Sequence, residues 1–197
     1  MEPNESLIAG PIKGYKAFCR DFTCRGFQFE IGQTYELPDG LEPIPCQQGF
    51  HFCQVPIHCN DYYSKDYKPR YAEIEAWDVI HSDNMSVARK IHIMKEIPND
   101  EWDRLDGRFE GNMRVYYLKN GKPHRGDGPA IEVANSHKLW YKNGLCHRED
   151  GPAIERSDGT KQWYRKGLRH RKDGPAWVSP DGIEEWWTNG RRNLPRD

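Results

Sequence analysis

The chain has 197 residues, of which 36% are hydrophobic and 12% aromatic, and its formal net charge is −1. This length allows one large domain or two small ones. No apolar run is long enough for a membrane-spanning helix, and the first ten residues lack the basic and apolar segments of a secretory signal. We therefore expect a cytoplasmic protein without a membrane span, whose six cysteines are reduced thiols.

The two halves of the chain differ in charge. Residues 1–113 carry 12 basic and 19 acidic side chains, a net charge of −7, whereas residues 114–197 carry 17 and 11, a net charge of +6. The asymmetry indicates two surfaces for different partners or two parts that attract each other, although scattered solvated charge gives the same sums.

Residues 1–12 are expected to form a flexible tail, and residues 13–97 a first domain. Phe27, Phe29 and Ile31 alternate with polar residues, which predicts a strand within 26–37. Pro56 stands where a helix can begin.

Residues 71–80 alternate as a half-buried strand does, and 90–97 alternate less cleanly. Asp83 is placed to cap a helical turn through Ala88. Strands mixed with short helices predict an α+β domain, and the polar segment 98–113 is expected to be an acidic joint.

A repeat of 23 residues fills the region 114–197, with three full copies and a degenerate last one that we expect to cap the array. Each copy has an aromatic pair, a turn glycine, a His-Arg pair and the residues Asp-Gly-Pro-Ala. The second copy shows all of them, at Trp140-Tyr141, Gly144, His147-Arg148 and 150–153.

The repeat predicts strands and turns. Asn143-Gly144 is a strong hairpin signal because both residues tolerate positive φ. Pro152 donates no backbone hydrogen bond, so it is expected at a bulge or edge. Successive hairpins would form a β-meander that advances by roughly 10 Å per repeat.

These residues resemble the MORN repeat family, in the variant with a His-Arg-x-Asp-Gly-Pro-Ala core, as in His147 to Ala153. The resemblance covers about 115–190. It implies a hairpin array that serves as a scaffold or a protein-contact module, without catalysis.

The first domain resembles, more loosely, an uncharacterised domain of phage and prophage proteins. The stretches that carry this resemblance are 14–18, 24–29, 32–35, 49–53 and 70–73. It implies a phage-encoded protein that acts in the cytoplasm of a host bacterium.

Stacked repeats place equivalent side chains in columns. Trp140, Trp163 and Trp186, continued by Tyr117, should line one face and pack internally. The neighbouring column is Tyr141, Tyr164 and Trp187, for which packing and binding are equally good interpretations.

A second set of candidate binding residues is the His-Arg column, formed by His124, Arg125, His147, Arg148, His170 and Arg171. The histidines are too far apart for one metal site, because zinc bonds are about 2 Å long. Each arginine precedes an aspartate by two residues, which favours a structural ion-pair ladder. The alternative is a basic strip for phosphates, an acidic protein surface, or single-stranded nucleic acid whose bases stack on the rings.

Two further alternatives concern the first domain. A zinc cluster could be formed by Cys46, His51, Cys53, His58 and Cys59, although the spacing matches no familiar zinc motif. An ADP-ribosyltransferase-like enzyme is faintly resembled, with His51 and Glu75 as its candidate residues, but the chain lacks the Ser-Thr-Ser strand of that family.

The favoured hypothesis is a non-enzymatic protein that binds and modulates a host protein or ribonucleoprotein complex, in defence or nucleic-acid processing. No catalytic residue, cofactor or oligomeric state is predicted. Direct binding of RNA or single-stranded DNA by the basic aromatic repeats is the other alternative.

Overall fold

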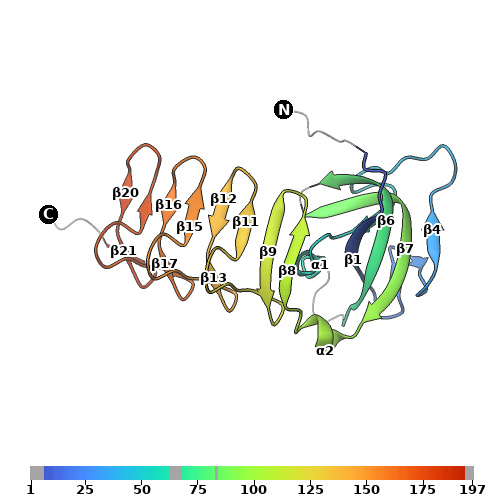
Figure 1. Cartoon of the computed structure of the whole chain (residues 1–197), viewed down its shortest axis with the longest axis horizontal. Helices are drawn as coiled ribbons and strands as arrows, with labels where there is room; N and C mark the ends of the chain where they lie inside the picture. The colour runs from blue at the N-terminus through green and yellow to red at the C-terminus, as the bar shows by residue number, and fades with distance from the viewer. Residues whose placement is uncertain (1–6, 63–67, 83, 194–197) are drawn as a thin grey trace. The chain divides into compact units, whose positions relative to one another are not determined.

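The computed structural model describes residues 7–62, 68–82 and 84–193, and the chain divides into two compact units, 1–104 and 105–197 (Figure 1). Both consist mainly of antiparallel β-strands. Within the described residues, none of the helical segments has the length or apolar character of a membrane span.

The first unit is built on a five-stranded antiparallel sheet. Its strands follow the order β1 (Ile12–Phe18), β6 (Arg70–Ser82), β7 (Met85–Ile97) and β4 (Thr34–Glu36). The fifth strand, β5 (Phe50–Phe52), pairs with residues 86–88 of β7, whereas β4 pairs with residues 90–92. The predicted strands over 71–80 and 90–97 are thus confirmed as parts of one long hairpin.

A bridge between β1 and the end of β5 closes this sheet into a ring. Tyr15 and Cys53 exchange backbone hydrogen bonds of 2.7 and 2.8 Å, so β1, β6, β7 and β5 follow one another around a common interior. Gly14 makes the closure possible, because a Cβ there would lie 2.5 Å from Phe52 Cδ2. No larger residue fits at this approach of strand to strand.

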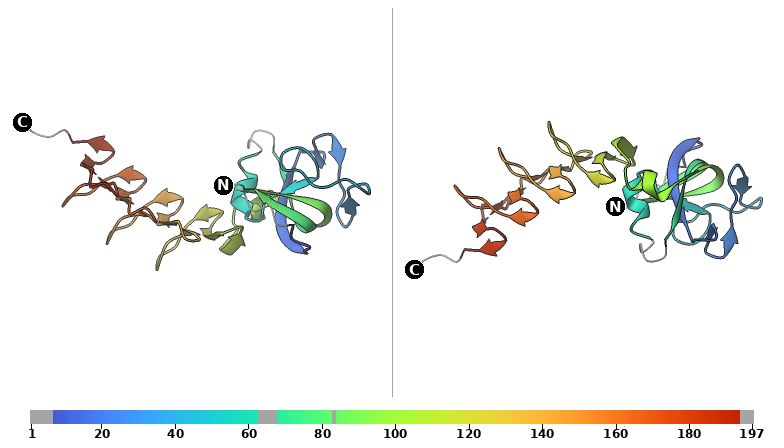
Figure 2. Two further views of the ribbon diagram at one scale, coloured as in Figure 1. Left: turned by 90° about the horizontal axis from the view of Figure 1, so that it is seen from above. Right: turned by 90° about the horizontal axis from the view of Figure 1, so that it is seen from below.

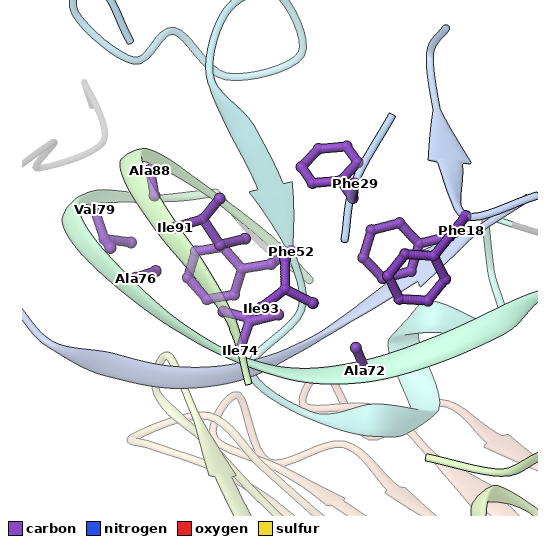
Figure 3. Close-up of a cluster of buried hydrophobic side chains, with 11 residues drawn as sticks. Phe18, Phe29, Phe52, Ala72, Ile74, Ala76, Val79, Ala88, Ile91 and Ile93 are labelled. Atoms are coloured by element: carbon purple, nitrogen blue, oxygen red, sulfur yellow. The ribbon is translucent and has the colours of Figure 1, made fainter. Parts of the chain in front are cut away.

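The interior of the ring holds the hydrophobic core (Figure 3). Phe18, Ile74, Ile91 and Ile93 are fully buried, and Phe18 stacks on Phe22 with ring centroids 4.1 Å apart. The apolar face that alternation predicts for residues 71–80 is confirmed by the complete burial of its alternate residues, including Ile74. Burial of such side chains stabilises a fold by about 1.5–3 kcal/mol each.

Helix is scarce in the described residues of the first unit, so the α+β class expected for 13–97 is not shown. The helices described there are α1 (Pro56–Cys59) and α2 (Asn99–Trp102), of four residues each. The helix start at Pro56 is confirmed. The helical turn expected from Asp83 to Ala88 is wrong, since β7 begins at Met85 and residue 83 lies outside the described residues.

Two expected boundaries also differ. Ile8, in the expected tail, exchanges backbone hydrogen bonds with Val79, while residues 1–6 lie outside the described part of the chain. The expected joint 98–113 contains α2, whose Trp102 ring stacks on Tyr71 at 3.9 Å, and then β8 (Gly107–Gly111) of the second unit. The polar composition of this segment did not indicate either element: Trp102 packs on the distant Tyr71, and β8 pairs with the adjacent strand 114–119.

The segment 26–37 is not one strand. It holds the end of the hairpin formed by β2 (Thr23–Cys24) and β3 (Phe27–Gln28), and then β4. Phe29 is buried, but Phe27 and Ile31 are exposed by 47% and 42%. The alternation of apolar and polar residues gave a wrong prediction of one strand here, because the backbone bends between Phe29 and β4.

The second unit is a β-meander whose successive hairpins lie side by side (Figures 1 and 2). Its sheet of nine strands includes β8, β9 and β10, followed by three further hairpins along the chain. Their bounds are β9 (Arg114–Lys119), β10 (Lys122–Pro123), β11 (Ile131–Val133), β12 (His137–Leu139), β15 (Ile154–Arg156), β16 (Lys161–Gln162), β19 (Trp177–Val178) and β20 (Glu184–Glu185).

The turn glycines of the repeats close a second series of short hairpins. These pair β13 (Tyr141–Lys142) with β14 (Leu145–Cys146), β17 (Tyr164–Arg165) with β18 (Leu168–Arg169), and β21 (Trp187–Thr188) with β22 (Arg191–Arg192). Asn143 and Gly144 have φ of 52° and 79°, the left-handed conformation that such a turn requires. Lys166 adopts the same conformation, at 50°, without asparagine's tolerance for it.

The alanine of each repeat core is the most tightly enclosed residue of the array. Ala130, Ala153 and Ala176 are fully buried. The backbone N–H of Trp140 donates to the carbonyl of Ala153 at 2.8 Å, and Ala153 donates in turn to Gln162 at 2.8 Å. The other two alanines make equivalent bonds, so the period of the sequence is also the period of the hydrogen bonding.

Candidate functional site

The arginines of the His-Arg column stack on the first aromatic column. Cζ of Arg125, Arg148 and Arg171 lies 4.0, 4.0 and 4.1 Å from the ring centroids of Tyr117, Trp140 and Trp163. A guanidinium over an aromatic face gains about 0.5–2 kcal/mol. Each arginine therefore covers the ring of its own repeat, while Trp186 at the end of the column is 46% exposed.

Two of these arginines, Arg125 and Arg148, form the ion pairs that their spacing predicts. Arg148 donates to Asp150 at 2.9 Å, to Glu155 at 2.9 Å and to the Pro152 carbonyl at 3.2 Å. The hydrogen bond from Arg148 holds the pKa of Asp150 below its usual value. Arg125 pairs with Asp127 and Glu132 in the same way.

The third copy keeps neither carboxylate partner, since within the described residues Arg171 forms no ion pair with Asp173. Val178 stands where the other copies have Glu132 and Glu155. Arg171 keeps its bond to the Pro175 carbonyl at 3.1 Å. The guanidinium of the third repeat is thus less compensated than those of the first two.

The histidines of the column link neighbouring repeats. Nδ1 of His124, His147 and His170 accepts a backbone N–H, each at 3.1 Å, from Asn143, Lys166 and Asn189 in the following turn. An accepting nitrogen carries no proton, so these bonds need Nδ1 unprotonated. The imidazoles therefore act as spacers between hairpins.

The residues of the second aromatic column have partners of their own. Burial is the main cause that raises the pKa of Tyr141, the Tyr164 hydroxyl donates to Gln162 at 3.2 Å, and Trp187 Nε1 donates to Glu185 at 2.9 Å. Arg169 lies 4.9 Å from the Trp187 ring centroid. These three aromatic residues are half-buried, and their role in binding stays a prediction.

A shallow groove of about 300 Å³ lies between the second and third repeat cores. Its lining includes Arg148, Asp150, Trp163, Arg165 and Lys172. Arg165 approaches Glu149 at 3.8 Å. The groove is polar and mixed in charge.

The five residues of the zinc alternative are not arranged as a metal site. Cys46 is exposed, whereas Cys53, His58 and Cys59 are buried. Across the described ranges no group of three or more His, Cys, Asp or Glu side chains is placed to hold a metal ion. Burial raises the pKa of the Cys59 thiol well above its usual value, which keeps it protonated.

The first unit contains a cavity of about 310 Å³ where β1, β2 and β5 meet. Apolar and sulfur-bearing side chains provide most of its wall, and Lys16, Arg25 and His51 are its basic residues. The full lining is Tyr15, Lys16, Ala17, Cys24, Arg25, His51, Phe52, Cys53, Cys59, Tyr62 and Met85. The described lining includes no acidic side chain, so Glu75 is not among its residues, and the ADP-ribosyltransferase alternative stays a prediction.

His51 is held as a neutral ring in this cavity. Burial first, and then the positive charges of Arg25 and Lys16, lower the pKa of His51 to about 4. Its Nε2 is buried, and in the described structure it has no hydrogen-bond partner. Sequence reasoning selected His51 for other chemistry and missed Lys16 and Arg25. A lysine inside the apolar strand segment Tyr15 to Phe18 was the available signal.

The comparisons with known proteins bear on the first unit alone. Residues 12–104 match the family model described as "Domain of unknown function (DUF7666)". No curated protein and no solved structure matches the chain.

Proposed function

We propose that this protein is a non-enzymatic interaction protein whose repeat unit contacts a partner protein. The observation that carries the proposal is a leucine row, formed by Leu145 and Leu168 at the same position of adjacent repeats. The two side chains are 50% and 49% exposed. One exposed leucine is ordinary, but two in register on a regular sheet form a repeated apolar contact.

The leucine row is supported by the turn of the following repeat. A Cβ at Gly167 would lie 3.4 Å from Leu145 Cδ2, and one at Gly190 would lie 3.3 Å from Leu168 Cδ2. Each leucine thus rests against the next glycine turn. In the first copy Lys122 occupies this position over Gly144, so the fold accepts a charged residue there.

Charge compensation favours a protein partner over nucleic acid. Arg125 and Arg148 each pair with two carboxylates, and their side chains are only 24% and 21% exposed. Guanidinium groups held this way are not available to replace the counterions of a phosphate backbone. The resemblance to MORN repeats supports the same scaffold role, and the phage source and bacterial host complex stay predictions.

Affinity capture from bacterial lysate tests the proposal with three baits: the wild type, L145K/L168K and K138A/K161A. The first variant uses the lysine of the first copy, and the second changes two exposed residues at another repeated position. We expect a set of proteins to be lost with L145K/L168K and kept with K138A/K161A, with or without nuclease. All baits must first show equal melting temperatures.

Two results would contradict the proposal. If the three baits capture the same proteins, the leucine row is not a contact. If nuclease treatment removes the captured set, and the capture by purified repeat protein falls steeply with salt, direct nucleic-acid binding replaces it.

A further inference from the structure

The cavity of the first unit contains a buried charge without a counter-charge. Lys16 is only 4% exposed. Its Nζ donates to the His51 carbonyl at 2.7 Å and lies 3.6 Å from Cys24 Sγ. No aspartate or glutamate of the described ranges forms an ion pair with it. A buried ammonium costs several kcal/mol unless it is paired.

The neighbouring aromatic rings compensate Lys16 only in part. Nζ lies 5.6 Å from the Phe18 ring centroid and 5.3 Å from that of Phe29. A cation at such distances gains a small part of what an ion pair supplies. The arrangement thus keeps a positive charge in place without neutralising it.

A second cation is held at the same cavity by a tight turn. Arg25 and Gly26 join β2 to β3 with φ of 52° and 77°, and Arg25 is exposed. Arg25 Nη1 also donates to the Cys46 carbonyl at 3.4 Å. The two lining cations and the absence of lining carboxylates make the described wall strongly positive.

The rest of the cavity wall has a polar side chain with a partnerless nitrogen, and apolar side chains beside it. His51 lines the same cavity, and its Nε2 is buried and has no hydrogen-bond partner in the described structure. Phe52 and Met85 line it as apolar groups. A volume of about 310 Å³ is at the lower end for small-molecule pockets, which limits the occupant to one small molecule.

We propose that this cavity binds a small organic anion. Lys16 and Arg25 hold its carboxylate or phosphate group, and Phe52 and Met85 contact its apolar part. This site lies in the unit that the family model matches, and it is independent of the repeat contact proposed above.

The test measures binding of phenyl phosphate, benzoate and benzamide to the full chain by ligand-observed NMR and by thermal shift. Benzamide has the shape of benzoate without its charge. We expect one or both anions to bind and benzamide not to bind. Comparison of phenyl phosphate with benzoate identifies which anionic group the site prefers.

Variants then connect binding to the cavity. K16M should weaken anion binding by about tenfold or more, because a charge-assisted hydrogen bond is lost. Its melting temperature should stay the same or rise, since an unpaired buried charge is replaced by an apolar side chain of similar length. R25Q should weaken binding without changing stability, and R20Q, at an exposed arginine outside the lining, should change neither.

Alkylation of single cysteines is a second measurement of anion binding. Bound anion should slow the reaction of Cys24 with iodoacetamide and leave exposed Cys19 unaffected, as peptide mass spectrometry would show. Absence of anion binding at millimolar concentration, equal binding of benzamide, or equal affinity of R25Q and wild type would overturn the proposal. A K16M variant that folds and binds as the wild type does would overturn it as well.

Discussion

In the first unit, strands that are far apart in sequence close around fully buried side chains such as Phe18 and Ile91. In the second unit, neighbouring hairpins stack in sequence order, and their contacts are stacked arginines, ion pairs and enclosed alanines. The first arrangement creates an interior that can surround a ligand. The second creates an extended surface, where each repeat stabilises the next and contacts nothing further away.

The largest loss of stability is expected from a substitution in the hydrophobic core of the first unit. Phe18→Ala should destabilise the first unit by about 3–5 kcal/mol, because it leaves a cavity inside the ring. Hydrogen exchange should show lost protection in β1, β6 and β7. Ile31→Ala, at an exposed apolar side chain, is the control and should cost about 0.5 kcal/mol or less. Equal effects of the two substitutions would show that the ring is not the stabilising core.

A smaller effect tests the arginine ladder of the second unit. Arg148→Met should cost about 1–2 kcal/mol, from the lost ring stacking and the unpaired Glu155. Arg171→Met should cost about half as much, since Arg171 stacks on its ring but has neither carboxylate partner in the described structure. Urea denaturation of both variants measures the difference. Equal costs would mean that the two ion pairs of Arg148 contribute nothing.

The pH dependence of stability is expected to come mainly from the first unit. His51 has a folded pKa of about 4, below its unfolded value, so the unfolded chain binds more protons between these two values. Stability should therefore fall as pH drops from about 6.5 toward 4, by less than about 3 kcal/mol because solvent screens the partly exposed ring.

Thermal melts from pH 7 to pH 4 of the wild type and His51→Gln measure this contribution. The variant should show a reduced slope, and a residual slope is expected because burial also lowers the pKa of His81. An unchanged slope in His51→Gln would mean that His51 is not the neutral ring of the cavity.

The smallest expected effect is a gain in stability within the repeats. Lys166 has a φ of 50° at the turn position where the second copy has Asn143. Lys166→Asn should stabilise the second unit by about 0.5–1 kcal/mol, because asparagine tolerates the left-handed conformation better. Lys142→Asn, one residue before the second turn, is the matched control, and urea denaturation should show no gain for it.

Much of the second unit is predictable from sequence because its contacts are local. The turn at Asn143-Gly144, the order of the hairpins and the pairing of Arg148 with Asp150 all follow from short spacings that recur every 23 residues. The hydrogen bond that His147 Nδ1 accepts from the next turn did not follow from the sequence, and neither did the exposure of the leucine row. Both depend on how one repeat lies against the next.

The first unit was less predictable because its important contacts join distant segments. Alternation predicted the buried face around Ile74, but nothing local indicates that Tyr15 and Cys53 pair. The same closure places Lys16 beside the His51 carbonyl and puts Arg25 at the cavity wall. These residues are 35 and 26 positions from His51 along the chain.

The sequence by itself determined the period, the turns and the aromatic columns of this protein, because hydrogen bonds and side-chain spacing within a hairpin depend on neighbouring residues. Only the tertiary structure decided which side chains remain free for a partner or a ligand. That outcome depends on burial and on charge compensation, as in the paired Arg148 and the unpaired Lys16, and both are set by strands that meet from distant parts of the chain.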